Sequence, residues 1–338
     1  MKNRVVSFGE IMGRLSPPNN ERIVQATNFN INYGGAETNT SVMLSNLGVE
    51  TCFFTAVPNN LVGQAAVNYL NRYGINTRNI VRTGDRLGLY YFECGNSIRS
   101  SRVIYDRKNS SVTECDIEKY DFESIFEGAE WFHFTGITAA LGENCLAVLK
   151  KSIKVAKSKG IKISIDLNYR RQLWSYDEFK KVVMPLLKDV DLCIGWIDLD
   201  QTGDFKMLNA AKDTLDNEYF KRVFSRMCKE FNIKYMATTL REAFSSSENA
   251  LTGIIYKDGE IVRSKRYNFG IVDRVGAGDA FAAGLIYKLL EDTNMKDVVE
   301  FATAASSIKH TVLGDSNIVS EEEILDLVGN SSGGEVKR

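Results

Sequence analysis

Histidine is scarce in this chain, and its scarcity excludes several kinds of site. Only His133 and His310 occur in 338 residues, so a zinc site built on histidine is nearly excluded, and a serine or cysteine nucleophile activated by histidine has little support. The six cysteines stand singly, without a C-x-x-C pair or the spacing of a disulfide framework. We therefore expect free thiols, most of them buried, in a reducing, cytoplasmic compartment.

An excess of either charge is also lacking. The chain carries 42 Lys and Arg against 43 Asp and Glu, a formal net charge of −1, whereas binding to nucleic acid or to a membrane surface needs a basic excess. No apolar run approaches the roughly 18 residues that a membrane span needs. The first residues also turn polar too soon for a signal peptide. We expect neither a nucleic-acid partner nor a membrane.

Familiar nucleotide-binding motifs are missing as well. No Gly-Lys dipeptide occurs, which excludes a Walker A loop. The segment Gly276-x-Gly278-x-x-Phe281 lacks the third glycine of the dinucleotide fingerprint and lies far from the first strand, so a Rossmann dehydrogenase is weakly supported. The motif set of protein kinases is also absent.

What the chain does contain is a regular alternation of strand-like and helical segments. Apolar runs predict strands, and amphipathic or apolar patterns predict the helices between them. Strands are expected at 4–8, 51–57, 131–135, 161–166, 192–195 and 235–239, and helices at 38–47, 63–73, 143–159, 177–187 and 280–290. This alternation is typical of an α/β fold with a central, mainly parallel sheet flanked by helices. Ligands of such sheets bind at the carboxyl ends of the strands.

Two segments break the alternation. Residues 10–34 and 88–105 show strand-like patterning and little helical signal. They could pair into a small accessory sheet over the site, or they could be ordinary edge strands. The Gly- and Ser-containing polar tail, 330–338, is predicted to be disordered.

The strongest local signal is the run DRVGAGD at 273–279, followed at once by an apolar helical pattern. Gly276, Ala277 and Gly278 allow a tight turn that exposes successive amides at a helix N-terminus, and such a turn is suited to a phosphate. In that position Asp279 could act as general base for an attacking hydroxyl. The alternative is that Asp279 only caps the helix.

A second glycine-rich element lies near the start of the chain. Gly34 and Gly35 precede a helix and permit close approach of a small polar ligand to backbone amides. Asn39 could exchange hydrogen bonds with a hydroxyl of that ligand. A plain loop-to-helix turn explains this pattern equally well.

These two motifs, in this order and roughly 240 residues apart, resemble the ribokinase (PfkB) family of sugar kinases. The resemblance covers nearly the whole chain, and it implies a ribokinase-like α/β core with a small β-sheet lid. The core would comprise residues 1–10, 35–87 and 110–329, and the lid residues 11–34 and 88–109. In such a kinase Asp279 deprotonates the acceptor hydroxyl, the amides of the glycine turn stabilise the transferring phosphoryl group, and ATP carries the Mg²⁺.

Within this family the chain resembles the members that act on 2-keto-3-deoxygluconate. Four stretches carry the likeness: GEIMGRLSPP at 9–18, YDR at 105–107, DLNYRRQLW at 166–174 and KHTVLGD at 309–315. The first of them lacks the early Asp that ribose- and fructose-type members use.

The carboxylate of such a keto acid also suits a planar guanidinium, which binds it bidentately. Arg170, just after a buried strand, is the candidate anchor. Arg107, with Tyr90 or Tyr105, would close on the substrate from the lid.

The nucleotide side departs from the family pattern. The resemblance assigns Asn168, Thr239 and Arg241 to the nucleotide, but TTLREAFSSS at 238–247 replaces the usual glycine-containing turn. The segment GWIDLD at 195–200 has neither the Asn nor the Glu that organises magnesium in the family. Asp198 and Asp200 are the candidates to replace them, but the metal ligands stay unassigned, and a monovalent-cation requirement stays open.

The expected function is ATP-dependent phosphorylation of 2-keto-3-deoxygluconate to its 6-phosphate, with a sugar acid and ATP as small-molecule partners. One alternative is a kinase of another sugar or sugar acid. A second alternative, motivated by the two departures, is a non-catalytic sugar or nucleotide sensor. The exposed edge of the lid could pair with a second copy of the chain to form a homo-oligomer.

Overall fold

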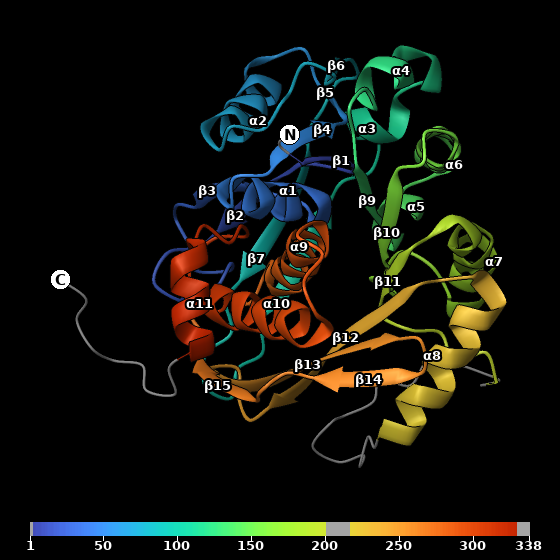
Figure 1. Cartoon of the computed structure of the whole chain (residues 1–338). Helices are drawn as coiled ribbons and strands as arrows, with labels where there is room; N and C mark the ends of the chain where they lie inside the picture. Colours follow the sequence, from blue (N-terminus) through green and yellow to red (C-terminus); the bar gives the residue numbers. More distant parts are fainter. Residues whose placement is uncertain (1–2, 201–216, 330–338) are drawn as a thin grey trace.

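The computed structural model describes residues 3–200 and 217–329, and it has the three-layered α/β architecture that the alternation predicts (Figure 1). A nine-stranded sheet forms the middle layer in the order β14-β13-β12-β11-β10-β9-β1-β4, with β15 paired to β13. Its strands are β1 (Arg4–Phe8), β4 (Glu50–Phe54), β9 (Trp131–Thr135), β10 (Lys162–Asp166), β11 (Leu192–Ile194), β12 (Tyr235–Ala243), β13 (Glu248–Lys257), β14 (Glu260–Arg263) and β15 (Tyr267–Gly270).

Pairing is parallel from β4 to β12 and antiparallel beyond β12. The inner strands are almost wholly buried, as β9 shows along its whole length, because helices cover both faces of a parallel sheet. The sheet thereby brings the carboxyl ends of its parallel strands to one edge, where the candidate site residues lie.

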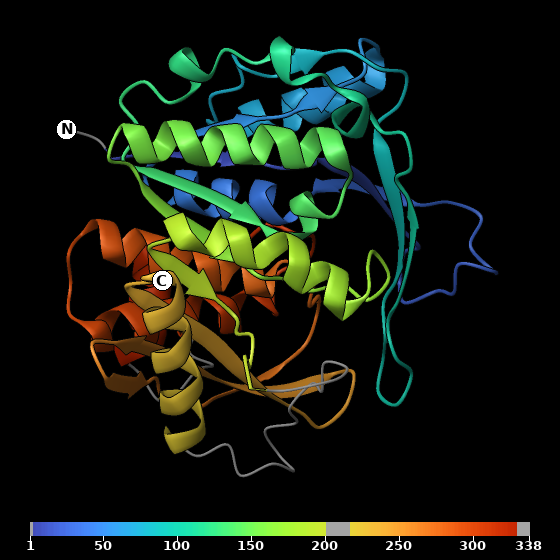
Figure 2. The same cartoon turned by 90° about the vertical axis from the view of Figure 1, so that its right-hand side faces the viewer.

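Helices cover both faces of this sheet (Figures 1 and 2). One face packs in a single apolar cluster against α1 (Ala36–Asn46), α9 (Ala277–Leu290), α10 (Met295–Lys309) and α11 (Glu321–Gly329). The other packs against α6 (Glu143–Ser158), α7 (Tyr176–Leu186), α8 (Asn217–Phe231) and the short helices α3 (Ser111–Glu114), α4 (Phe122–Ile125), α5 (Gly136–Ala139), η1 (Ile117–Lys119) and η2 (Leu187–Asp189). Beyond β4 lie α2 (Leu61–Arg72) and the pair β5 (Ala56–Val57) and β6 (Val81–Arg82).

Helix α9 runs through the interior and is apolar nearly all round, as expected for a buried helix. It packs tightly on α10 because Gly284 has no side chain: a Cβ there would lie 2.7 Å from the Cα of Ala302. This close packing holds the N-terminus of α9 firmly at the edge of the sheet.

The two segments that broke the alternation form a separate four-stranded sheet, which confirms the accessory sheet over the edge-strand alternative. Its order is β3 (Asn30–Gly34), β2 (Met12–Ser16), β7 (Gly88–Glu93) and β8 (Arg102–Asp106). Figure 2 shows this lid sheet standing beside one end of the main sheet. Met12, Tyr90 and Phe92 form its inner apolar face, which contacts Val275 of the core. The division into core and lid at the boundaries given above is our proposal.

Several expected boundaries need correction. The strand expected at 51–57 is broken into β4 and β5, and α9 begins at Ala277, three residues earlier than predicted. The segment 238–247 is not mainly a loop, because β12 continues to Ala243 against β13 and only then turns. The predicted disordered tail lies outside the described residues.

The thiols of all six cysteines are free, as predicted; four of them are buried, and Cys94 and Cys228 are partly buried. Within residues 3–200 and 217–329, no helix combines the length and the apolar character needed to cross a membrane.

Candidate active site

A cavity of about 910 Å³ lies where the carboxyl ends of β10 and β11, the N-terminus of α9 and the lid meet. This is the edge at which parallel sheets bind ligands. Every predicted site residue except Gly34 lines it: Gly35, Asn39, Tyr90, Tyr105, Arg107, Asn168, Arg170, Thr239, Arg241, Gly276, Ala277, Gly278 and Asp279.

The glycine turn is the first element of the site. Gly276 is the N-cap of α9 and adopts the left-handed conformation, φ 85°, which favours glycine. A Cβ at this position would lie only 1.6 Å from the backbone oxygen of Asp315, so no larger residue fits. Ala277 and Gly278 open the helix, so their amides have no carbonyl partner within α9, and the Ala277 amide makes only a long hydrogen bond, 3.5 Å, to the backbone oxygen of Arg274. The positive end of α9 faces the cavity.

Asp279 lies in this first turn and is 9% exposed. Its Oδ2 accepts a 2.7 Å hydrogen bond from Nδ2 of Asn39, across from α1, and no side-chain hydrogen bond caps α9. The N-cap residue of α9 is Gly276, so Asp279 does not occupy the capping position. Burial raises the pKa of Asp279 to about 8, the neighbouring Asp166 adds to the increase, and the bond from Asn39 opposes it. A carboxylate of raised pKa held near an anion-binding turn is suited to general-base catalysis.

Asp166 and Glu37 also line the cavity, and sequence reasoning gave neither carboxyl group a role. Burial raises the pKa of Asp166 to about 6, although the charge of Arg170 opposes the increase. The Glu37 carboxylate accepts hydrogen bonds from the amide and hydroxyl of Thr135 and from the hydroxyl of Thr138. It ties α1 to the end of β9, so the Gly35 turn is held against the sheet.

Three arginine side chains, Arg170, Arg241 and Arg274, line the cavity and form no salt bridge with any described residue. Burial lowers the pKa of Arg241, and the positive charges of Arg274 and Arg170 lower it further. Three guanidinium groups without an anionic partner are suited to a ligand that carries several negative charges. Arg274 was missed as a site residue, although it lies within the glycine motif.

The lid residues already have partners in this structure. The Tyr90 hydroxyl donates to the Asp315 carboxylate, and Nε of Arg107 donates to Oε2 of Glu10 at 2.8 Å. Tyr105 lies at the rim and is 41% exposed. Of the two arginines predicted to anchor a carboxylate, Arg170 is therefore the one with free donors.

Arg14 connects the lid to the glycine turn. It is 4% exposed, and its two terminal nitrogens lie 2.6 Å from Oδ2 of Asp273 and 2.5 Å from Oδ1 of Asp315. Asp273 in turn accepts hydrogen bonds from the amides of Val275 and Gly314. Sequence reasoning used Arg14 only as part of a motif and gave it no role.

Gly34 has a different place from the one predicted. It does not line the cavity; instead, a Cβ at Gly34 would lie 2.2 Å from Oδ2 of Asp315. Glycine is needed here to admit the Asp315 carboxylate rather than to approach a ligand.

Among residues 3–200 and 217–329, no group of three or more His, Cys, Asp or Glu side chains is arranged to bind a metal ion. Asp198 and Asp200, the suggested replacements, pair with Arg222 and do not line the cavity, so that suggestion is wrong. A fixed cation does lie behind the glycine turn: the buried ammonium of Lys309 donates to the backbone oxygens of Asp273 and Val312, at 3.2 and 3.1 Å.

Comparison with known proteins agrees with this geometry. The chain is 40% identical to a Thermotoga maritima protein whose crystal structure is described as that of 2-dehydro-3-deoxygluconokinase, with a TM-score of 0.92 over 97% of this chain and 100% of that one. It is 28% identical over 326 residues, 96% of each chain, to the 2-dehydro-3-deoxygalactonokinase of Haloferax volcanii. A putative ribokinase II from Escherichia coli, solved with ATP and Mg²⁺, shares the fold at 18% identity and a TM-score of 0.79, over 97% of this chain and 99% of that one.

A family model also matches most of the chain. The residues matched are 2–195 and 252–322, and the model describes the pfkB family of carbohydrate kinases. The matched segments contain both glycine motifs, Asp279 and all four lid strands. The chain therefore belongs to the pfkB family of carbohydrate kinases.

Proposed function

We propose that the protein transfers the γ-phosphoryl group of ATP to the terminal hydroxyl of 2-keto-3-deoxygluconate. The observation that carries this proposal is the free guanidinium of Arg170 in the cavity that holds Asp279. A neutral sugar needs no cation at this place, whereas the carboxylate of a keto acid binds a guanidinium bidentately. The name of the Thermotoga relative, in which dehydro and keto denote the same group, points in the same direction.

In this proposal each element of the cavity has one task. Arg170 holds the substrate carboxylate, so that the far end of the sugar chain reaches Asp279. Asp279 takes the proton of the terminal hydroxyl, whose oxygen then attacks phosphorus. The amides of Ala277 and Gly278 stabilise the negative charge on the transferring group. Arg241, with Asn168 and Thr239, contacts the nucleotide phosphates.

Magnesium would enter with the nucleotide in this scheme, since the described residues offer no cage for it. Bound to the phosphates, the ion would screen their charge. The side chains of Arg241 and Arg274 line the cavity and would add positive charge beside the same phosphates. The E. coli neighbour of the same fold was solved with ATP and Mg²⁺.

A panel of acceptors tests the proposal. With ATP and Mg²⁺, we expect turnover of 2-keto-3-deoxygluconate and little turnover of ribose or fructose. The Arg170→Ala variant should raise KM for the keto acid by about tenfold or more, since a charged hydrogen bond is lost, whereas Arg171→Ala, an exposed neighbour outside the cavity, should not. Phosphorylation of a neutral sugar in preference to the keto acid would overturn the assignment.

The catalytic group is tested separately from the substrate. Asp279→Asn should abolish phosphoryl transfer to every acceptor while the circular dichroism spectrum stays that of the folded protein. Retained turnover would remove Asp279 as the base, and intact nucleotide and sugar binding without any turnover by the wild type would favour the sensor alternative.

The second candidate substrate is 2-keto-3-deoxygalactonate, because the Haloferax relative is named for it. The two keto acids differ only in configuration at C4, and both carry the carboxylate that Arg170 would bind. The same panel, with both acids present at equal concentration, measures the preference directly as a ratio of kcat/KM.

A further inference from the structure

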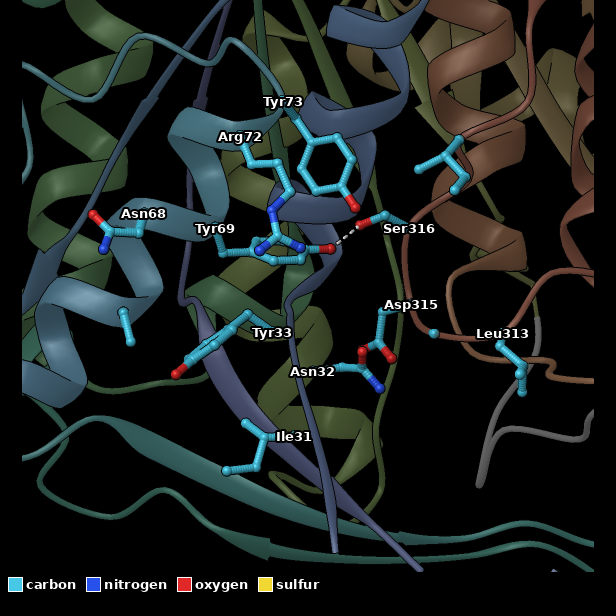
Figure 3. Close-up of a pocket in the computed structure, with 13 residues that line it drawn as sticks. Ile31, Asn32, Tyr33, Asn68, Tyr69, Arg72, Tyr73, Leu313, Asp315 and Ser316 are labelled. Atoms are coloured by element: carbon cyan, nitrogen blue, oxygen red, sulfur yellow. Dashed lines mark hydrogen bonds between the residues drawn. The ribbon is translucent and has the colours of Figure 1, made fainter. Parts of the chain in front are cut away.

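A second cavity, of about 360 Å³, adjoins the active site (Figure 3). It lies between β3, α2 and the loop that contains Asp315 and Ser316, and Asp315 lines both cavities. Its volume is at the lower end of the range for small-molecule sites. Nothing in the proposed phosphoryl transfer uses it.

The wall of this second cavity carries a positive charge, on the exposed side chain of Arg72, that has no carboxylate partner among the described residues. Arg72, in the last turn of α2, makes no hydrogen bond or ion pair with a described residue. The acidic residue in the lining, Asp315, already binds Arg14 and Tyr90. Figure 3 shows Tyr69, Arg72 and Tyr73 reaching from α2 toward the Ser316 loop.

Neutral polar groups complete the lining. Asn32 and Asn68 present side-chain amides, and the tyrosines present hydroxyl groups and rings. A guanidinium with amide and hydroxyl groups around it is suited to a small anion that also carries hydroxyls. An uncharged apolar ligand would leave Arg72 without a partner.

The second cavity is connected to the catalytic base by a chain of hydrogen bonds. The Tyr69 hydroxyl lies 2.9 Å from Oγ of Ser316, as the dashed line in Figure 3 marks. Ser316 donates to Oδ1 of Asn39 at 3.4 Å, and Nδ2 of Asn39 donates to Oδ2 of Asp279 at 2.7 Å. Ser316 and Asn39 are both buried, so the chain is shielded from solvent and its members polarise one another.

We propose that the second cavity binds a small hydroxylated organic anion through Arg72, and that its occupancy acts on Asp279 through Tyr69, Ser316 and Asn39. A ligand that draws the Tyr69 hydroxyl toward itself takes it away from Ser316. The loss of that hydrogen bond changes the one that Ser316 donates to Asn39, and this in turn changes the hydrogen bond that Asn39 donates to Asp279. The protein would thus carry a regulatory site for a metabolite that is neither substrate nor nucleotide.

Binding is tested first, with the full chain and without ATP or keto acid, so that the outcome does not depend on the proposed substrate. The probes are sn-glycerol 3-phosphate and D-glycerate, which share a three-carbon hydroxylated skeleton and differ in the anionic group. Calorimetry should show saturable binding of at least one probe, and the stronger of the two identifies the ligand as a phosphate ester or a carboxylate.

Three variants locate the bound probe. Arg72→Ala should weaken binding by about tenfold or more. Arg78→Ala, an exposed arginine that lines neither cavity, and Arg170→Ala, in the active site, should bind as the wild type does. No saturable binding of either probe at millimolar concentration, equal binding by Arg72→Ala, or loss of binding in Arg170→Ala would each overturn the site.

Coupling to the base is tested by the pH dependence of turnover with saturating probe. In the wild type the probe should shift the acidic limb of the pH profile of kcat/KM. In Ser316→Ala, which still contains Arg72, the probe should bind and leave that limb where it was. An equal movement in Ser316→Ala, or no movement in the wild type at saturation, would overturn the connection.

Discussion

At the scale of single residues, the site depends on how one carboxylate is buried. An aspartate side chain ordinarily has a pKa of 3.8, and burial raises the pKa of Asp279 to about 8. The hydrogen bond from Asn39 is the largest effect that opposes this increase. A base works only when ionised, so the free enzyme should gain kcat/KM as the pH rises through about 8 and reach a plateau above it.

Removing the Asn39 hydrogen bond should therefore raise the pKa of Asp279 further. We predict that Asn39→Ala moves the acidic limb of the kcat/KM profile upward by about one pH unit, the equivalent of one lost hydrogen bond. Activity at pH 7 should fall, and most of it should return at high pH. Asn46→Ala is the matched control, since Asn46 lies on the same helix but binds the backbone oxygen of Val319. An unchanged limb in Asn39→Ala would show that Asn39 does not tune the base.

A second residue-scale prediction concerns cations. The backbone oxygens of Asp273 and Val312, which could bind a monovalent ion behind the glycine turn, already accept from the Lys309 ammonium. We predict that replacing K⁺ and Na⁺ by tetramethylammonium leaves kcat unchanged in a steady-state assay. Lys309→Met should lower kcat by about tenfold or more, because a buried and a partly buried backbone oxygen lose their donor. Loss of wild-type activity without K⁺ would contradict this account.

At the scale of secondary-structure elements, the lid is held to the core by buried polar groups. Arg14 of β2 and Tyr90 of β7 both bind Asp315, and Arg14 also binds Asp273 beside the glycine turn. A buried charge pair adds little net stability over apolar residues, but removal of one partner is costly because the other stays buried and charged. The lid strands and the catalytic turn should therefore lose their order together.

Arg14→Met tests this connection. Because Asp273 and Asp315 would then be buried without a countercharge, we predict a loss of about 3–5 kcal/mol in the free energy of unfolding, measured by denaturant titration. Tyr90→Phe removes one hydrogen bond and should cost about 1–2 kcal/mol. Arg102→Met, on the exposed edge strand β8, is the control. If Arg14→Met loses no more stability than Arg102→Met does, the ion pairs do not hold the lid.

The same elements show where sequence reasoning succeeds. The boundaries of β1 and β9 were predicted to the residue, because each is a short run rich in β-branched or aromatic residues that a glycine ends, at Gly9 and Gly136. The accessory sheet was predicted because both of its segments lacked helical periodicity. Of the residues that line the active-site cavity, Gly35, Asn39 and those at 276–279 followed from motifs whose glycines are needed for local backbone geometry, and the other predicted ones followed from the family resemblance.

Sequence reasoning fails where a structural feature depends on residues that are far away in the chain. The continuation of β12 to Ala243 depends on its antiparallel partner β13, which was not anticipated. Arg14 meets carboxylates 259 and 301 residues away, and the need for glycine at 34 arises from the Asp315 side chain. Pairs of opposite charge this far apart leave no periodic signal, so one sequence cannot identify them.

At the scale of the whole molecule, the outer face of the lid carries a row of apolar side chains, which is unusual for a solvent-exposed surface. Leu15, Ile31, Tyr91 and Ile104 stand in register across all four of its strands. Ile31 and Ile104 are 63% and 54% exposed, and the edge strands β3 and β8 have no further partner among the described strands. A continuous apolar row on an open sheet is typical of an association surface.

A second copy of the chain is the partner that this surface suits, because two identical lids would each cover the apolar row of the other. We predict a dimer by sedimentation equilibrium at micromolar concentration. Ile104→Lys should shift the population toward monomer, since a lysine in the middle of the row cannot be buried without a countercharge. Ile98→Lys is the matched control, because Ile98 is 97% exposed in the β7–β8 loop and lies off the row. If the wild type sediments as a monomer at all concentrations, or if both variants dissociate equally, the lid face is not the interface.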